Sequence, residues 1–328
     1  MTTIGVDLGG TKVLAAVVNH GKPGKTVKQP TPTTGPSSVV EAIVNAVKEL
    51  GGADRVGLGT PGVVDESTGT VSHAPNLAGW DEEVQLREML ERALPGCEVR
   101  IDNDVNVGVL GEQSAGAARG HRDVLGVFAG TGVGGGLVLD GKLRRGPRGI
   151  TGEIGHVIVV PDGRRCGCGG SGHLEAYAGR AGIEAEARRR HAAGLPTALV
   201  ELAGDGAMKS GVIAKALAAR DPVALELIDG AVVALGTAIA SAVTLVDLTT
   251  VVLGGGITEK LGADFVARVD AAVQARVIAG VPVNVVAARR QDCHRRCGRC
   301  LINHPMTTPA SAEQSITSQI GPFFSPTT

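Results

Sequence analysis

The chain has 328 residues and a formal net charge of −1 at pH 7, so its charges nearly balance. This balance argues against nucleic-acid or membrane-surface partners that bulk electrostatics would attract. A hydrophobic share of 43 % is too high for a disordered chain, and the length suffices for two domains with substantial cores. The first charged residue, Asp7, interrupts any leader-like segment, so we expect a soluble, cytoplasmic protein.

Strand and helix patterns alternate along the first third of the chain. Residues 3–18 predict a β-hairpin, because two apolar runs flank a turn of Gly9, Gly10 and Thr11. Such alternation is typical of a largely parallel sheet that is covered by helices. The later patterns predict a helix over 39–50, a strand over 55–59, an acidic-started helix over 81–94, a strand over 98–102 and a helix over 104–117.

The second half of the chain opens with a similar hairpin. Residues 123–140 place a glycine-rich turn between two apolar runs, which indicates a duplicated α/β unit; coincidence is the alternative, because glycine hairpins are common. Asp221 and Pro222 predict the start of a helix that runs to about residue 246. The many small residues of this helix favour a buried position over a membrane span. A buried strand over 250–253 follows.

We place the boundary between two α/β domains near residues 108–112. The first domain, residues 1–108, carries the first glycine turn. The second domain, residues 109–290, carries the second hairpin. Residues 291–328 form a tail rich in Ser, Thr and Pro that lacks hydrophobic periodicity.

Three glycine runs predict a site for phosphate groups. Glycines lack the Cβ atoms that block close approach, so backbone N–H groups can face a phosphate, and a Thr adds a hydroxyl. At the first turn, Asp7 is placed to hold a hydrated Mg²⁺. An ordinary glycine hairpin is the alternative, and the sequence has neither a P-loop nor a Rossmann glycine pattern. The runs comprise Gly9, Gly10, Thr11 and Lys12; Gly130, Thr131 and Gly132, continuing to Gly136; and Gly254, Gly255 and Gly256.

Three polar residues, Asn103, Asp104 and Asn106, follow the strand predicted over 98–102. Phosphoryl transfer to an alcohol needs a carboxylate that accepts the hydroxyl proton, and Asp104 is the best candidate. A plain helix N-cap is the alternative for one of these residues. It does not easily explain all three beside glycine-rich loops.

Histidines, cysteines and glutamates cluster between residues 153 and 175. Two Cys and two His in glycine-rich turns suit a tetrahedral structural Zn²⁺ site, with a loop of free thiols as the alternative. Glu153 and Glu175 flank the predicted ligands and suit hydrogen bonds to sugar hydroxyls; solvated surface glutamates are the alternative. The four candidate ligands are His156, Cys166, Cys168 and His173.

Seven motifs give the chain, from residue 4 to about residue 288, a resemblance to the ROK family (repressor, open reading frame, kinase) of sugar kinases. The resemblance implies the actin-like ATPase fold, which is hexokinase- and ribonuclease H-like, with two α/β domains around a cleft. It also implies a homodimer. The motifs stand at residues 7–12 (DLGGTK), 59–62 (GTPG), 76–80 (NLAGW), 103–106 (NDVN), 130–136 (GTGVGGG), 152–156 (GEIGH) and 166–169 (CGCG).

The resemblance implies an ATP- and Mg²⁺-dependent kinase that phosphorylates the 6-hydroxyl of a hexose, with glucose favoured. An N-acetylhexosamine kinase or fructokinase of the same family is the alternative, as is a catalytically impaired protein. The family's repressors carry a helix-turn-helix segment ahead of the kinase-like part, and no room for one precedes the first strand. By resemblance Asp104 is the catalytic base; the sugar contacts are Asn76, Asn103, Asp104, Glu153, His156 and Glu175; the nucleotide contacts include Gly10, Thr11, Thr131, Gly132, Gly254 and Gly255; and the zinc ligands include His156, Cys166 and Cys168.

Two departures from the family matter. The family usually has a third Cys where this chain has His173, and imidazole is a competent Zn²⁺ ligand, so we expect the site to be kept. From Arg289 onward an Arg- and Cys-rich run replaces the family's closing helix, for which we favour an altered reading frame. We expect residues beyond about 290 not to form that packed helix. Cys293, Cys297 and Cys300 have the spacing of the cluster motif of radical SAM enzymes. That motif normally precedes a barrel, for which almost no chain remains here, so we do not favour this interpretation.

Overall fold

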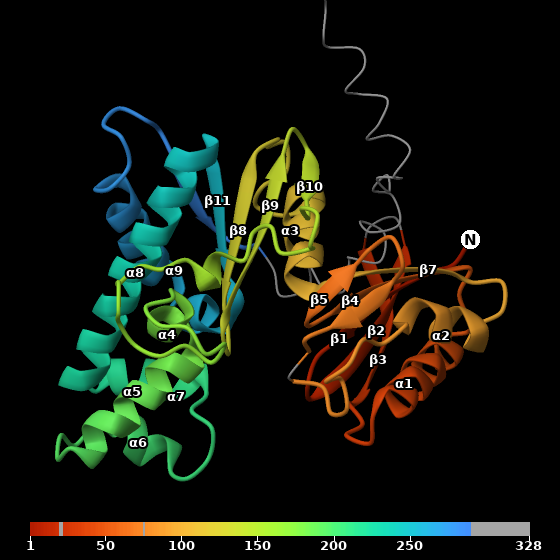
Figure 1. The fold of residues 1–328 in the computed structure, drawn as a ribbon, viewed down its shortest axis with the longest axis horizontal. Coiled ribbons are helices and arrows are strands. Elements are labelled where there is room, and N and C mark those ends of the chain that lie inside the picture. Colours follow the sequence, from red (N-terminus) through yellow and green to blue (C-terminus); the bar gives the residue numbers. More distant parts are fainter. Residues whose placement is uncertain (20–21, 75, 290–328) are drawn as a thin grey trace, which may run out of the picture.

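Two lobes, each built on a five-stranded sheet, make up the computed structural model, which describes residues 1–19, 22–74 and 76–289 (Figure 1). The strands of the first sheet, in spatial order, are β3 (Lys22–Pro30), β2 (Lys12–Asn19), β1 (Thr3–Leu8), β4 (Arg55–Thr60) and β7 (Glu98–Asn103). Those of the second sheet are β10 (Lys142–Arg144), β9 (Val133–Leu139), β8 (Val124–Ala129), β11 (Thr250–Gly254) and β12 (Asn284–Ala287).

The two sheets share one topology. In each lobe the first three strands pair antiparallel, and the next two extend the sheet in parallel from the first strand. The hairpins predicted over 3–18 and 123–140 are confirmed. The matching strand order supports the interpretation that an α/β unit is duplicated in this chain.

Helices α1 (Pro36–Glu49) and α2 (Leu86–Ala93) belong to the first lobe, where α1 packs on β2 and β3. Val39, Ile43 and Val47 are buried and lie four residues apart, so they share one face of α1. This face joins the core of the first lobe. The apolar spacing in the sequence therefore predicts the buried face of α1 correctly.

The helix predicted over 81–94 begins later than expected. Residues 81–85 are not helical, and Val84 instead forms a β-bridge with Val71 through two backbone hydrogen bonds of 2.9 Å. The bridge buries Val84, whereas a helical first turn would be made of three exposed acidic residues, so the prediction was wrong here. The bridge extends a small two-stranded sheet that consists of β5 (Val63–Asp65) and β6 (Thr70–Ser72).

The longest helix of the second lobe, α8 (Pro222–Val246), begins where the sequence predicts. Asp221 caps it by accepting a hydrogen bond of 2.7 Å from the backbone N of Ala224. By length and composition α8 could cross a membrane, but 67 % of its most apolar stretch is buried inside the protein, as expected of a core helix. The other helices of this lobe are α4 (Glu175–Ala178), α5 (Arg180–Ala192), α6 (Ala198–Ala203), α7 (Ser210–Ala218) and α9 (Gly255–Gln274).

Helix α3 (Asp104–Ala115) joins the two lobes. It contacts β4 and β7 of the first sheet and β8 and β9 of the second. The proposed boundary at residues 108–112 falls inside this continuous helix, so the chain passes between the lobes without a loop. The predictions for the tail, including Cys293, Cys297 and Cys300, fall outside the described residues.

Candidate active site and metal centre

The predicted first-lobe site residues meet at one edge of the first sheet. In the parallel register, Asp7 lies beside Gly59, and Thr60 lies beside Asn103. Parallel strands end at the same edge, so the end of β1, the turn after β4 and the start of α3 are neighbours. Asp7 therefore lies on the same edge as Asp104, although the two are far apart in the sequence.

The first glycine turn is closed by a hydrogen bond of 3.0 Å from the backbone N of Gly9 to the carbonyl O of Lys12. A Cβ atom on Gly10 would lie 2.6 Å from the carbonyl O of Asn76, so only glycine fits there. This contact places Asn76 against the turn that is predicted to hold phosphate groups. Thr11 and Lys12 are exposed, so the turn faces outward from the sheet edge.

Asn103, rather than Asp104, is the N-cap of α3. Its Oδ1 accepts from the backbone N of Val105 at 2.9 Å and of Asn106 at 3.3 Å, and its Nδ2 donates to the carbonyl O of Gly62 at 3.0 Å. Asp104 is the first residue of the helix, and its Oδ1 accepts from the backbone N of Val105 at 2.9 Å. The capping role is thus held by Asn103, and the plain-cap alternative does not account for Asp104.

The second glycine turn is held by the start of α5. The backbone N atoms of Arg180 and Ala181 donate to the carbonyl O atoms of Gly130 and Thr131 at 3.0 and 2.9 Å. The Arg180 side chain also donates to Thr131 Oγ1 at 2.6 Å. The sequence reasoning missed Arg180, which brings a guanidinium to the turn predicted to hold phosphates.

Glu175 and the third glycine run lie beside the second glycine turn, at the edge of the second sheet. Glu175 Oε2 accepts from the backbone N of Val133 at 2.9 Å, and a Cβ atom on Gly132 would lie 2.0 Å from that oxygen. Gly255 has φ +90°, and a Cβ atom there would lie 2.4 Å from the carbonyl O of Ala129. Gly254 pairs with Phe128 in the parallel register. The third glycine run therefore lies beside the second turn.

Glu153 and His156 lie at the one-turn 3₁₀ helix η1 (Ile154–His156), where Glu153 Oε2 and His156 Nε2 are 3.9 Å apart. Burial raises the pKa of Glu153; His156 counters this shift, whereas the charges of Glu175 and Asp104 add to it. The carboxylates of Glu175 and of Asp104, the latter from the first lobe, are therefore near enough to Glu153 to influence it. The sequence predicts Asp104, Glu153 and Glu175 as residues of one site. In the structure, both Asp104 and Glu175 lie within electrostatic reach of Glu153.

The four predicted metal ligands form one cluster. One ligand atom from each of His156, Cys166, Cys168 and His173 lies within 4.8 Å of all the others. Cys168 Sγ and His173 Nδ1 are 3.1 Å apart. Around a tetrahedral Zn²⁺ the donor atoms would be roughly 3.3–3.8 Å apart, given bonds of about 2.0–2.3 Å, so the donors fit an ion after small adjustments.

A tight turn places the two thiols. The backbone N of Cys166 donates to the carbonyl O of Gly170 at 2.9 Å, and that of Gly169 donates to the carbonyl O of Cys166 at 3.0 Å. Burial raises the pKa of Cys166 to about 11, so this thiol keeps its proton at neutral pH without a cation. Cys166 Sγ lies 3.6 Å from Glu175 Oε1, which connects the thiol turn to a predicted sugar contact.

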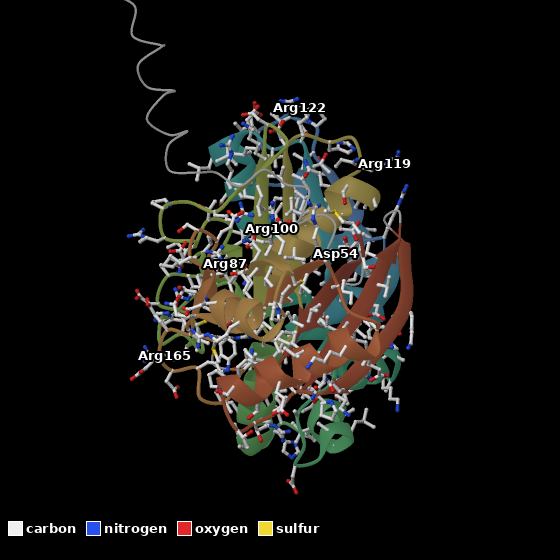
Figure 2. The ribbon with its side chains drawn as sticks, turned by 90° about the vertical axis from the view of Figure 1, so that its right-hand side faces the viewer. Asp54, Arg87, Arg100, Arg119, Arg122 and Arg165 are labelled. Carbon is white, nitrogen blue, oxygen red and sulfur yellow. The ribbon has the colours of Figure 1, made fainter. Side chains whose placement is uncertain are left out.

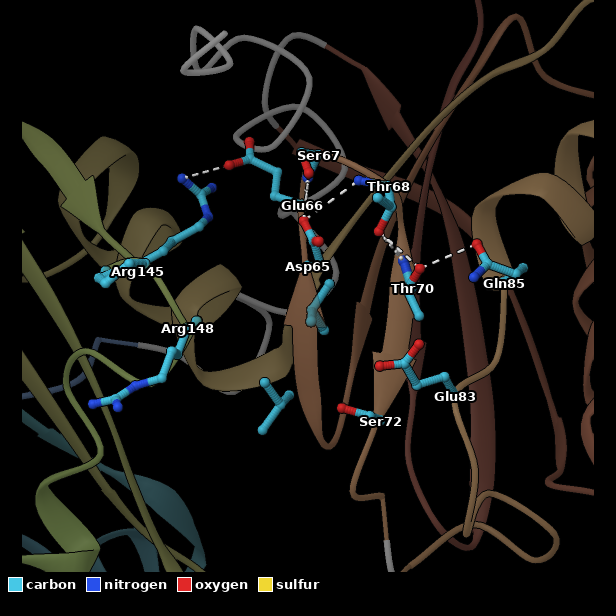
Figure 3. Close-up of a pocket in the computed structure, with 15 residues that line it drawn as sticks. Asp65, Glu66, Ser67, Thr68, Thr70, Ser72, Glu83, Gln85, Arg145 and Arg148 are labelled. Carbon is cyan, nitrogen blue, oxygen red and sulfur yellow. Dashed lines mark hydrogen bonds and ion pairs between the residues drawn. The ribbon is translucent and has the colours of Figure 1, made fainter. Parts of the chain in front are cut away.

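Three charged residues that the sequence reasoning missed join the lobes. Arg145, which follows β10 in the second lobe, pairs with Asp102 and Glu66 of the first lobe. Asp102 could have been recognised from the sequence, because it is a charged residue directly before Asn103. The residues around Arg145 and Glu66 in the sequence give no sign of an ion-pair partner. Beside them lies a cavity of about 790 Å³, lined by β5, β6 and residues 145–149 (Figure 3).

The sequence matches the model of the ROK family over residues 3–300. The glucokinase of Streptomyces coelicolor is 40 % identical over 267 residues, which are 79 % of this chain and 83 % of that protein. A ROK family glucokinase from Streptomyces griseus, solved in complex with glucose and AMPPNP, has a TM-score of 0.77, is 33 % identical and covers 91 % of this chain and 98 % of that chain. The N-acetyl-D-glucosamine kinase of Salmonella gallinarum gives a shorter match, 36 % identical over 190 residues, or 53 % of this chain and 61 % of that protein.

These similarities agree with the order of motifs in the sequence and with the paired topology of the sheets. The family match spans nearly all described residues of both lobes. Solved relatives such as the Streptomyces griseus glucokinase are sugar kinases with the actin-like ATPase fold, so the predicted fold class is confirmed. The chain belongs to the ROK family.

Proposed function

We propose that this ATP-dependent sugar kinase is a glucokinase, which transfers the γ-phosphoryl group of ATP to the 6-hydroxyl of glucose. The observation that carries the proposal is the meeting of the start of α3, next to Asp104, with the second glycine turn: a Cβ atom on Gly134 would lie 2.5 Å from Val105 Cγ2, and the neighbouring Val133 N donates to Glu175 Oε2 at 2.9 Å. Carboxylates can each accept hydrogen bonds from sugar hydroxyls, and one of them can accept a proton. The similarity to glucokinases over most of the chain supports glucose as the acceptor.

Asp104 is the proposed general base. As the sugar's O6 bonds to the γ-phosphorus and the bond to the bridging oxygen of ADP breaks, the hydroxyl proton passes to the Asp104 carboxylate. Asn103 holds the start of α3 through its cap, which fixes the place from which Asp104 projects. Most of the rate gain in such a transfer comes from positioning and charge, which the two lobes supply together.

The glycine turns are the proposed phosphate sites. Around the first turn we assign Asp7, Gly9, Gly10, Thr11 and Lys12, and around the second we assign Gly130, Thr131 and Gly132. Gly254 and Gly255 are the proposed adenosine contacts. Mg²⁺ would neutralise charge on the phosphates when bound, with Asp7 as the residue placed to hold its hydration shell.

The sugar side is assigned to residues of both lobes. Asn76 contacts the first turn, and Asn103, whose side chain donates to the Gly62 carbonyl, directly precedes Asp104. Glu153 and His156 belong to η1. Glu175 also accepts from the backbone N of Val133, so it connects sugar recognition to the second phosphate turn.

A structural Zn²⁺ held by His156, Cys166, Cys168 and His173 is part of the proposal. The support is the donor set and the closeness of its four ligand atoms. The ion would lock His156 and the thiol turn, which adjoin Glu153 and Glu175. Its role is therefore to shape the sugar side rather than to take part in phosphoryl transfer.

A coupled ADP-release assay with glucose, N-acetylglucosamine, mannose and fructose tests the sugar assignment. We expect the highest kcat/KM for glucose. An N-acetylhexosamine kinase is the second candidate, supported by the shorter match to such an enzyme. If kcat/KM were higher for N-acetylglucosamine than for glucose, the glucokinase assignment would be replaced by that candidate.

Arg180→Met should raise the KM for ATP by roughly 10–100-fold, because a charged hydrogen bond at the second phosphate turn contributes roughly 1.5–3 kcal/mol. Glucose binding should stay within about twofold, because Arg180 contacts Thr131 and not the proposed sugar residues. Arg189→Met is the matched control, since Arg189 lies on the same helix but donates to Glu186, at 2.7 and 2.8 Å, rather than to the glycine turn. Equal ATP affinities in the two variants would refute this role.

The homodimer, the cytoplasmic location and the lack of nucleic-acid or membrane partners stay predictions of the sequence. The same holds for the domain limits at residues 1–108 and 109–290, which we retain as a proposal. Sedimentation at several protein concentrations would measure the oligomeric state, and a single species of monomer mass would contradict the homodimer.

A further inference from the structure

Arg145 connects the two lobes through three of its side-chain nitrogens. Nε and Nη2 donate to Asp102 Oδ2 at 2.8 and 2.6 Å, and Nη1 pairs with Glu66 Oε2 at 2.9 Å. Figure 3 shows Arg145 reaching from the second-lobe loop toward Glu66. The side chains of Arg145, Asp102 and Glu66 are 15 %, 1 % and 18 % exposed, so the charges are largely removed from water.

The other carboxylate oxygen of Asp102 is bound to the start of α3. Its Oδ1 accepts from the backbone N of Asn103 at 2.8 Å and from Nδ2 of Asn106 at 3.0 Å. Asn103 is the N-cap of the helix, and Asp104 is its first residue. One buried carboxylate therefore links Arg145 to the segment that carries the proposed base.

Glu66 is fixed to the first lobe by a separate set of contacts. Arg87, labelled in Figure 2, donates to the carbonyl O of Glu66 at 3.1 Å and of Ser67 at 2.6 Å, which holds the turn between β5 and β6. Burial raises the pKa of Glu66, and the charge of Arg145 is the strongest influence against this shift. Glu66 and Asp102 are thus two carboxylates, each held in place by the first lobe, with which Arg145 forms ion pairs.

Arg145 is also tied to the sugar-side segment of the second lobe. Its carbonyl O accepts from the backbone N of Thr151 at 3.0 Å, and the chain continues from there to Glu153. Within this loop a Cβ atom on Gly149 would lie 3.1 Å from the carbonyl O of Val64. The loop therefore lies against the first lobe at two places, and displacement of one lobe would move Arg145 and Glu153 together.

We propose that Arg145 is a positioning residue, which couples the seating of the second lobe to the orientation of Asn103 and Asp104 through Asp102. This inference rests on the proposed kinase function. The lobes bring the proposed base and the proposed sugar contacts together only when they are correctly seated. In the observed arrangement of the lobes, Arg145 contacts both Asp102 and Glu66, and through Asp102 it holds the start of α3.

A double-mutant cycle separates positioning from stability. Arg145→Gln leaves the buried Asp102 carboxylate without its ion-pair partner, and Asp102→Asn leaves Arg145 with Glu66 alone, so each change should lower Tm by roughly 5–10 °C. The double variant removes both charges of the Arg145–Asp102 pair and leaves Glu66, which is 18 % exposed, as the one carboxylate that has lost Arg145, so its Tm should recover to above that of Arg145→Gln. Its kcat for glucose should nevertheless stay down by about 10²-fold with KM little changed, because small misplacements of catalytic groups have effects of that size.

The control for losing an Arg–carboxylate pair is Arg92→Gln, whose partner Glu88 lies one turn away on α2; the two side chains are 76 % and 63 % exposed. That variant should keep both Tm and kcat. A double variant that regains kcat together with Tm would overturn the proposal and leave Arg145 a structural residue. Single variants with normal kcat would overturn it as well.

Amide hydrogen exchange gives a test that does not need kinase activity. The amides of Val105 and Asn106, both bonded to Asn103 Oδ1, should exchange faster in the double variant than in the wild type. Unchanged exchange at these amides would overturn the positioning role even if the wild type is an active kinase. If the wild type phosphorylates no sugar while exchange changes as expected, the proposed function fails and the coupling stands.

Discussion

Asp104→Asn should lower kcat for glucose phosphorylation by about 10²–10⁴-fold, the usual contribution of a positioned general base. The amide keeps the size of the side chain but cannot accept the sugar's proton. Stability should be preserved, because Asn103 and not Asp104 caps α3. Coupled assays would give kcat, thermal melts would give Tm, and titration calorimetry would give the affinity for glucose.

Asp221→Ala is the control for Asp104→Asn, because it should lower stability and leave kcat unchanged. Asp221 is the N-cap of α8 and lies in the second lobe, where its side chain accepts from the backbone N atoms of Ala224 and Ala198. Its loss should reduce stability by about 1 kcal/mol and leave kcat unchanged. Near-normal kcat in Asp104→Asn would show that the mechanism names the wrong base, and Glu153 would be the next residue to replace.

Loss of zinc should raise the KM for glucose by roughly 10–100-fold and lower Tm. His156 is both a proposed ligand and the neighbour of Glu153, and Cys166 lies beside Glu175, so losing the ion frees both glutamates. We expect about one Zn²⁺ per chain by elemental analysis of the purified wild type. Cys168→Ser should remove most of it, which avoids chelators that would also remove Mg²⁺.

Cys97→Ser is the matched control, because Cys97 is a buried cysteine of the first lobe that takes no part in the cluster. It should keep its zinc and its KM for glucose. Wild-type protein purified without zinc, together with an unchanged KM in Cys168→Ser, would contradict the metal assignment. In that case the four residues would be a thiol and imidazole cluster without an ion.

Local signals explain why much of the fold could be predicted. Glycine turns between apolar runs fixed the two hairpins, and the pairing of Asp221 with Pro222 marked the start of α8. The metal-ligand candidates lie close in sequence, so a few tight turns suffice to bring them together. These features depend on contacts within short segments, which a sequence pattern can express.

The errors have physical causes as well. An acidic run before an apolar segment predicts a helix start, yet Val84 gains a buried bridge to Val71 that the local pattern does not encode. Asp102 and Arg145 are 43 positions apart, and Thr131 and Arg180 are 49 apart. Such pairs depend on how the lobes and loops are seated, so they become visible only in the folded protein.

Identification of the product tests the central claim most directly. The protein should convert glucose and ATP·Mg²⁺ into glucose 6-phosphate and ADP in equal amounts, as measured by mass spectrometry and phosphorus NMR. With 6-deoxyglucose, which lacks the accepting hydroxyl, it should form no phosphosugar although titration calorimetry still detects binding. Release of inorganic phosphate without a phosphosugar, or phosphate attached at another hydroxyl, would contradict the assignment of Asp104 as the base that activates the 6-hydroxyl.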